Sequence, residues 1–218
     1  MLRKLVTPVL ITFLATAVYA ADVVDFDALI HVINNSPNVT VDTALNTATP
    51  IVTADGVNYI GPDIYGALNR ESRGWWTVGS NPASGLRVRF NTSDFGHLVD
   101  GLFLFKVDAV QFDGDNDTLN AAEIFTSQIQ RLDSAMIRFV VEDGGQFYIS
   151  EASANFVTGG TGNQSDSFSI EALSASWYDY DPSTAAGVSV IGSPATPAFD
   201  DIDFVGFTLF ADAIDAGD

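Results

Sequence analysis

Cysteine is absent from this chain of 218 residues, and basic residues are scarce. Without cysteine the fold has no disulfides and no thiolate-bound zinc, so a hydrophobic core has to stabilise it unaided. Nine Lys and Arg residues stand against 28 Asp and Glu residues, which gives a formal net charge of −19. That charge argues against nucleic acid, whose phosphates require a basic surface, and against anionic membrane surfaces. It favours solubility and the binding of cations.

Histidine is nearly absent as well, with only His31 and His97 in the chain. Two histidines provide too few nitrogen ligands for a zinc site when no cysteine is present. The G-x-S-x-G motif of many serine hydrolases is also missing. With so many acids, pairs of carboxylates arise by composition alone and indicate no glycosidase. We therefore assign no catalytic residues from the sequence.

Long apolar runs are missing except at the start, MLRKLVTPVLITFLATAVYA. There Arg3 and Lys4 precede a short hydrophobic segment, and Val18 and Ala20 occupy the −3 and −1 positions of a cleavage site. A transmembrane helix takes about 20 apolar residues, more than this run contains. We expect residues 1–20 to be a bacterial secretory signal peptide. We expect residues 21–218 to be one domain, extracellular or periplasmic, that does not insert in a membrane.

The rest of the chain shows a hydrophobic period of two, which is typical of β-strands. Leu86, Val88 and Phe90 alternate with arginines, and residues 100–112, 134–143 and 166–174 alternate in the same way. Residues 201–211 are apolar at both odd and even positions, which predicts a central strand covered on both faces. The sequence predicts an all-β antiparallel sandwich of jelly-roll or lectin-like type. It also predicts one short helix around 118–133, where isoleucines and a leucine recur on one side.

The segment MIRFVVEDGGQFYISE predicts a β-hairpin. If only one face of the hairpin is buried, Phe147 has to share that face with Phe139. A three-residue turn at 143–145 achieves this register. Arg138 and Tyr148 then lie together on the outer face.

An acidic loop precedes the predicted helix. Its oxygen-bearing side chains are Asp113, Asp115, Asp117, Asn120 and Glu123. Hard cations such as Ca²⁺ take six to eight oxygen ligands, and closely spaced Asp and Asn supply them. The run resembles the calcium loops of EF-hand and dockerin segments, although Thr118 replaces their glycine and Glu123 falls one position early. Two interpretations stay open: a Ca²⁺ site, or an acidic cap on the following helix.

A cationic and aromatic set is the candidate ligand face. Its members are Trp75, Trp76, Arg87, Arg89, Arg138 and Tyr148. Tryptophan rings stack on the apolar patches of sugars, and guanidinium groups bind hydroxyls, carboxylates or sulfates bidentately. Strand alternation places these arginines, with Lys106, away from the predicted core. The alternative is that they form exposed ion pairs with neighbouring acids, which contribute about 0–1 kcal/mol each.

Three stretches carry a resemblance to known proteins: IRFVVEDGGQFYISE, ASWYDYDPST and FDDIDFVGFTLFAD. This pattern of strand, turn and aromatic residues resembles the late strands of secreted bacterial β-sandwich modules of the concanavalin-like and galactose-binding-like types. The resemblance covers roughly the last eighty residues. It implies an extracellular domain directed at glycans, and it provides no functional residues.

Three functional hypotheses follow. The first is a non-catalytic carbohydrate-binding protein that Ca²⁺ stabilises. Its partner is an extracellular polysaccharide, and an anionic polysaccharide is one candidate. The second is a structural protein of an extracellular surface assembly. The third is a small polysaccharide hydrolase or lyase, for which Arg138 with Tyr148 is the best lyase pair that the sequence offers.

Overall fold

A computed structural model describes residues 47–50, 63–69, 75–81, 85–91, 98–107, 119–129, 132–156, 164–182 and 192–213. These residues form strands, turns and loops and contain no helix, so the all-β prediction is confirmed for them. The strands are β1 (Ile64–Asn69), β2 (Trp75–Asn81), β3 (Gly85–Asn91), β4 (Leu98–Lys106), β5 (Ala121–Ile129), β6 (Leu132–Asp143), β7 (Gln146–Ser150), β8 (Ala154–Phe156), β9 (Gln164–Glu171), β10 (Trp177–Asp179), β11 (Pro194–Ala195) and β12 (Ile202–Ala213).

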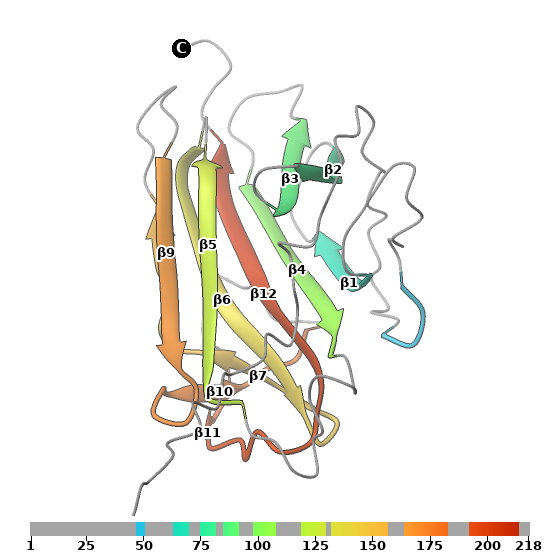
Figure 1. The fold of residues 1–218 in the computed structure, drawn as a ribbon, viewed down its shortest axis with the longest axis vertical. Coiled ribbons are helices and arrows are strands. Elements are labelled where there is room, and N and C mark those ends of the chain that lie inside the picture. The colour runs from blue at the N-terminus through green and yellow to red at the C-terminus, as the bar shows by residue number, and fades with distance from the viewer. Residues whose placement is uncertain are drawn as a thin grey trace, which may run out of the picture.

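One large antiparallel sheet dominates the described structure (Figure 1). Its strand order is β1-β4-β12-β6-β7-β10-β11, and β8 pairs with a further part of β6. Strand β12 lies between β4 and β6 and pairs with both along most of its length. Its alternating positions are buried on both faces, as Phe204 and Leu209 illustrate. The prediction of a central, doubly covered strand at 201–211 is thus confirmed.

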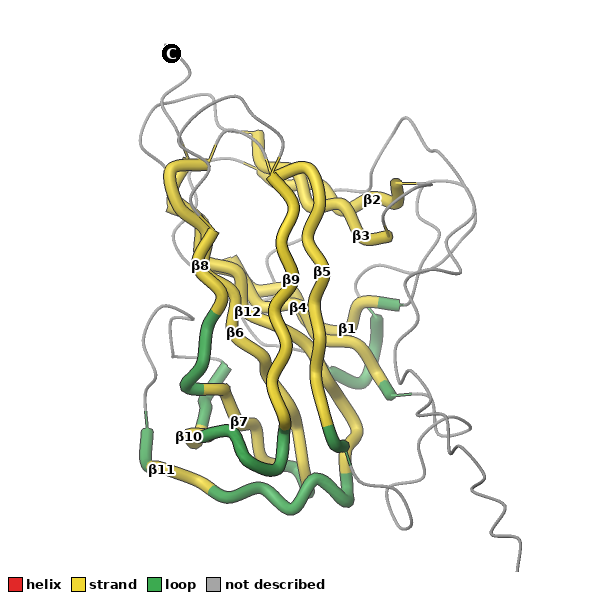
Figure 2. Tube along the Cα trace, turned by 60° about the vertical axis from the view of Figure 1, so that its left-hand side comes forward, coloured by secondary structure: helices red, strands yellow, loops and turns green. Residues whose placement is uncertain are grey.

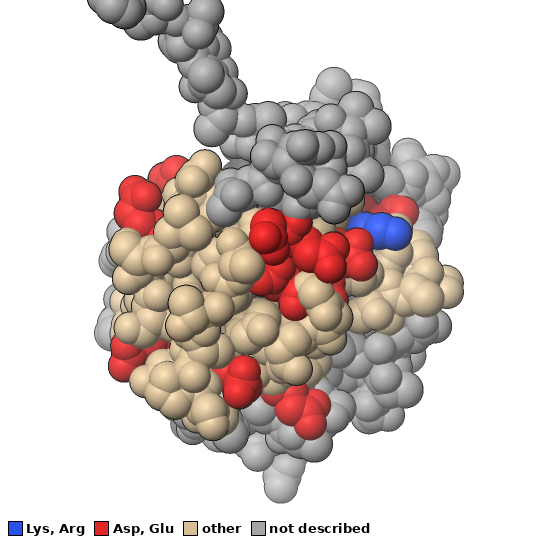
Figure 3. Space-filling model, turned by 90° about the horizontal axis from the view of Figure 1, so that it is seen from below, with Lys and Arg blue, Asp and Glu red and all other residues tan. Residues whose placement is uncertain are grey.

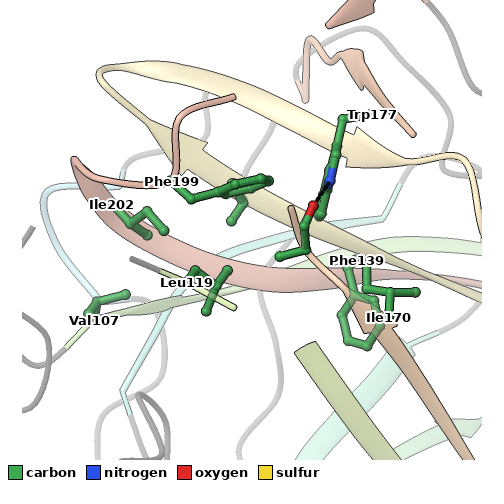
Figure 4. Close-up of a cluster of buried hydrophobic side chains, with 9 residues drawn as sticks. Val107, Leu119, Phe139, Ile170, Trp177, Phe199 and Ile202 are labelled. Carbon is green, nitrogen blue, oxygen red and sulfur yellow. Dashed lines mark hydrogen bonds between the residues drawn. The ribbon is translucent and has the colours of Figure 1, made fainter. Parts of the chain in front are cut away.

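The first face of the large sheet, which we name the Phe139 face, packs against the β5–β9 ribbon (Figures 1 and 2). Phe139 of β6 stacks on Phe168 of β9 with ring centroids 5.0 Å apart. Trp177 and Phe199 close the lower part of this core, edge to face at 5.2 Å (Figure 4). The Trp177 indole N–H donates to the main-chain oxygen of Ala172 at 2.9 Å, so its one polar atom is satisfied.

The opposite face, which we name the Val140 face, is also buried. Val140 is 1% exposed and Ile149 is 0% exposed. They pack with Leu102, Leu104, Phe204 and Tyr180 in a second cluster. The sequence reasoning placed Val140 on the solvent-exposed outer face of the hairpin, and that assignment is wrong. Both faces of the central strands are apolar because both are covered.

The predicted helix around 118–133 is also wrong where the structure describes it. Residues 121–129 form β5, which pairs antiparallel with β9. Ile124 lies opposite Phe168, and Ala122 lies opposite Ile170. A partner strand that is distant in the sequence decides the structure here, and it overrides a weak helical pattern.

The β6–β7 hairpin turns through two residues, not the predicted three. Asp143 pairs with Gln146, and Gly144 and Gly145 have φ angles of 61° and 84°. Two consecutive residues at positive φ are typical of a type I′ turn, which glycine adopts without strain. The shorter turn moves Phe147 and Ile149 to the Val140 face and Tyr148 to the Phe139 face. This arrangement is stable because both faces are buried.

Candidate functional site

The β2–β3 ribbon contains four of the predicted ligand-binding residues (Figure 2). Its register pairs Thr77 with Arg89 and Gly79 with Arg87, and Trp75 belongs to the same alternating set. Trp76 pairs with Phe90 and belongs to the other set, with Val78 and Val88. Residues of one set lie on one side of an antiparallel ribbon. The register therefore groups one tryptophan with two arginines and the other tryptophan with apolar residues.

Arg138 lies on β6 in the large sheet, at a position of the Val140 face. One guanidinium nitrogen, Nη1, donates to the main-chain oxygens of Ser150, at 2.9 Å, and of Glu151. Burial lowers the pKa of Arg138, and the negative charge of Glu151 opposes this effect. The guanidinium group is thus held in a fixed position where β7 ends.

Tyr148 does not join Arg138, so the expectation that they share an outer face is wrong. Tyr148 pairs with Val141 and with Asp179, and its ring packs against the core of the Phe139 face. Burial raises the pKa of Tyr148, and the charges of Asp143 and Asp179 raise it further. A lyase pair built from Arg138 and Tyr148 is incompatible with this register.

Glu151 and Tyr178 are the polar residues that the structure brings to Arg138, and sequence reasoning missed this group. Val140 pairs with Ile149, and Ile149 pairs with Tyr178. Glu151 directly follows β7, and its main-chain oxygen and its charge both interact with Arg138. The Tyr178 hydroxyl donates to Glu151 Oε1 at 3.5 Å. The two-residue turn was the signal that would have revealed the group, because it sets which residues of β7 share a face with Arg138.

Two buried polar atoms beside this group lack hydrogen-bond partners in the described part of the chain. They are Arg138 Nε and Thr208 Oγ1, and Thr208 is directly opposite Arg138 on β12. Thr208 is 1% exposed, so water does not solvate its hydroxyl from the surface. An unsatisfied buried hydroxyl destabilises a protein by about 1–3 kcal/mol. Arg138 and Thr208 are therefore an unusual polar pair on the otherwise apolar Val140 face.

We expect Thr208→Val to raise the free energy of unfolding by about 1 kcal/mol, because it replaces the unsatisfied hydroxyl with a methyl group of similar volume. Valine also suits a central strand. Urea unfolding followed by tryptophan fluorescence measures the change. Thr208→Ala is the control, since it removes the hydroxyl but leaves a cavity and should destabilise the protein. A loss of stability in Thr208→Val would mean that the hydroxyl is hydrogen-bonded in solution.

Only part of the predicted calcium site lies in the described structure. Asp113, Asp115 and Asp117 fall outside the described residues. Asn120, just before β5, and Glu123, within it, are both exposed. The main-chain oxygen of Asn120 accepts a hydrogen bond from Ala172 at 2.7 Å. Because this segment is a strand, the alternative of an acidic helix cap is wrong. Within the described ranges, no three His, Asp or Glu side chains are arranged to hold a metal ion.

Acidic side chains gather at the lower end of the molecule (Figure 3). There the Asp143 carboxylate accepts main-chain hydrogen bonds from Ala198, Phe199 and Asp201, at 2.9, 3.0 and 3.1 Å. Glu142 accepts one from Asp203 at 3.3 Å. Burial raises the pKa of Glu142, and repulsion from Asp203 raises it further. These two carboxylates hold the loop that leads into β12.

We expect Glu142→Gln to gain stability relative to the wild type as the pH rises from about 4 to 7. The raised pKa means that folded Glu142 binds its proton more tightly than the unfolded chain does. The wild type is therefore stabilised by protonation and loses that contribution as the pH rises through the raised pKa. Glutamine stays neutral and keeps one acceptor oxygen.

Melting temperatures of both proteins at several pH values test this expectation. The melting temperature of Glu142→Gln relative to that of the wild type should rise between pH 4 and 7. Glu171→Gln, the same chemical change at an exposed position, controls for the altered net charge. A melting-temperature difference between the two proteins that does not change with pH, or that changes in the opposite direction, would contradict the role assigned to Glu142.

Comparison of the chain with protein-family models, with curated proteins and with solved structures finds no match. Among the described residues, no helix has the length and apolar character that crossing a membrane requires.

Proposed function

We propose that the protein is a secreted, non-catalytic carbohydrate-binding β-sandwich that recognises an anionic polysaccharide through the β2–β3 ribbon. The observation that carries this proposal is the register that groups Trp75 with Arg87 and Arg89. A sugar chain needs an aromatic surface for its C–H patches and cationic groups for its carboxylates or sulfates. The β5–β9 ribbon packed on the large sheet supports the two-layer architecture.

The charge of the protein makes this ribbon distinctive. The chain has 28 acidic residues, and removal of residues 1–20 would leave seven of its nine basic ones. Two of those seven belong to the same register set as Trp75. A local pair of arginines on an acidic protein attracts an anionic chain to that part of the surface. Calcium would reduce repulsion between the remaining acids and the ligand.

Trp75→Ala is expected to weaken the binding of an acidic polysaccharide at least about tenfold, because it removes the stacking surface. Affinity electrophoresis in gels containing alginate measures this, with calcium and again with EDTA. Arg87→Gln with Arg89→Gln should abolish the retardation. Trp76→Ala is the matched control, since its register set is apolar. It should change the melting temperature more than the affinity.

Equal retardation of Trp75→Ala and the wild type would contradict the proposal. Ordered oligomers without any polysaccharide affinity would instead favour the surface-assembly hypothesis, and electron microscopy of the concentrated protein detects them. Cleavage of the polysaccharide during the assay would favour the enzyme hypothesis.

A further inference from the structure

We infer that Arg138, Glu151 and Tyr178 form a second sugar subsite, on the Val140 face of the large sheet, which binds a neutral pyranose through a pair of adjacent hydroxyls. The inference rests on the proposed function in one respect, that the ligand is a carbohydrate. It differs in the surface used and in the charge of the sugar.

Three neighbouring strands of the large sheet bring the group together. Arg138 comes from β6, Glu151 follows β7, and Tyr178 lies in β10. The N–H of Glu151 donates to the main-chain oxygen of Ser176 at 2.9 Å, which ties the end of β7 to the start of β10. Strand pairing thus fixes the spacing of the three side chains without any ligand.

The guanidinium group of Arg138 is already oriented for binding. Its Nη1 is anchored on two main-chain oxygens, from Ser150 and Glu151, so little side-chain freedom is left to lose. Arginine presents five N–H donors in a planar fork, and this anchoring uses only one nitrogen. Donors held in advance in this way bind a ligand with a smaller entropic penalty.

Tyr178 supplies a surface for a sugar ring. Its ring is half-buried against the cluster that contains Ile149 and Tyr180, so it has a fixed position but retains contact with solvent. Its hydroxyl bonds Glu151, which is exposed. The site therefore combines an aromatic face, a cationic donor group and an anionic acceptor, as hydrogen bonding to a diol requires.

The charges of the site select a neutral sugar. Arg138 and Glu151 together carry no net charge, and the chain has a net charge of −19. An acidic sugar would meet the Glu151 carboxylate and the field of the whole protein. A neutral diol avoids both, because one hydroxyl can accept from Arg138 while the other donates to Glu151.

The test is affinity electrophoresis of the full protein in gels that contain a neutral polysaccharide, with mixed-linkage β-glucan, galactomannan and xyloglucan as probes and alginate as the acidic reference. The wild type should be retarded by at least one neutral probe. Tyr178→Ala and Glu151→Gln should each weaken that retardation at least about tenfold. Tyr178→Phe, which keeps the ring, should lose less. Leu173→Ala, at an exposed position, is the surface control.

The two binding-site proposals can be disproved independently of each other. Trp75→Ala should reduce only the retardation by alginate, and Tyr178→Ala only that by the neutral probe. Absence of retardation by all three neutral probes would overturn this inference. So would unchanged retardation of Glu151→Gln and Tyr178→Ala, measured under conditions where their melting temperatures show that they are folded. Neither result would affect the alginate experiment.

Discussion

Replacement of Asp143 with alanine is expected to lower the free energy of unfolding by about 4 kcal/mol. Asp143 is 8% exposed, and its carboxylate accepts three main-chain hydrogen bonds from the loop before β12. Hydrogen bonds to a charged acceptor contribute about 1.5–3 kcal/mol each, and their effects within one group are not fully additive. Alanine would leave three N–H groups without this acceptor.

The loop depends on Asp143 because it contains a residue in an unfavourable conformation. Phe199 has a φ angle of 59°, which destabilises a residue other than glycine by about 1–2 kcal/mol. Its N–H donates to Asp143, its main-chain oxygen accepts from Leu119 at 3.2 Å, and its ring is 1% exposed. These contacts offset the strain together. Loss of Asp143 therefore also loosens the packing of Phe199 on Trp177.

Urea unfolding and the near-ultraviolet circular dichroism of tryptophan measure both effects. Asp143→Asn should be less destabilising, because one side-chain oxygen still accepts hydrogen bonds. Asp201→Ala removes the same charge at an exposed position and should change stability by about 0.5 kcal/mol or less. A loss below about 1 kcal/mol in Asp143→Ala would contradict the assigned role of the carboxylate.

The period-two pattern was sufficient to predict the all-β class and the central position of β12. It failed where pairing with a strand distant in the sequence, and not the local pattern, determines the secondary structure. Residues 121–129 form a strand because β9 pairs with them, and the sequence gives no direct indication of that pairing. A short segment with isoleucines at several spacings is compatible with either structure.

The error at the β6–β7 turn had a different origin. The sequence reasoning assumed one buried face, and under that assumption only a three-residue turn aligns Phe147 with Phe139. The large sheet is buried on both faces, so the two-residue Gly144–Gly145 turn is equally compatible with the hydrophobic pattern. Register changes by one residue exchange every side chain between faces. That single error separated Arg138 from Glu151 in the sequence-based prediction.

The tryptophan pair illustrates what the sequence could and could not provide. Alternation alone indicates that Trp75 and Trp76 fall on opposite sides of a strand. It does not say which of them accompanies Arg87 and Arg89, because that depends on the pairing of β2 with β3. The register places Trp75 in the set that contains Arg87 and Arg89, and Trp76 in the set that contains Val78 and Val88.

Replacement of Gly206 with alanine should be as damaging as loss of Asp143, with a decrease of about 4 kcal/mol or more in the free energy of unfolding. Gly206 lies in β12, between Leu104 of β4 and Val140 of β6. A Cβ atom at this position would lie 2.0 Å from the main-chain oxygen of Phe103 and 3.1 Å from the Cα of Leu104. These are main-chain atoms of a paired strand, so a side-chain rotation does not relieve the contact.

Val205→Ala provides a matched comparison on the neighbouring position of β12. It removes two carbon atoms from a half-buried side chain and should destabilise the protein by about 1–2 kcal/mol. Adding one carbon at Gly206 should thus lower the free energy of unfolding more than removing two carbons at Val205. If Gly206→Ala yields no folded protein, circular dichroism of Val205→Ala still shows that the strand tolerates change. A Gly206→Ala protein within about 1 kcal/mol of the wild type would mean that β12 and β4 are further apart at this point.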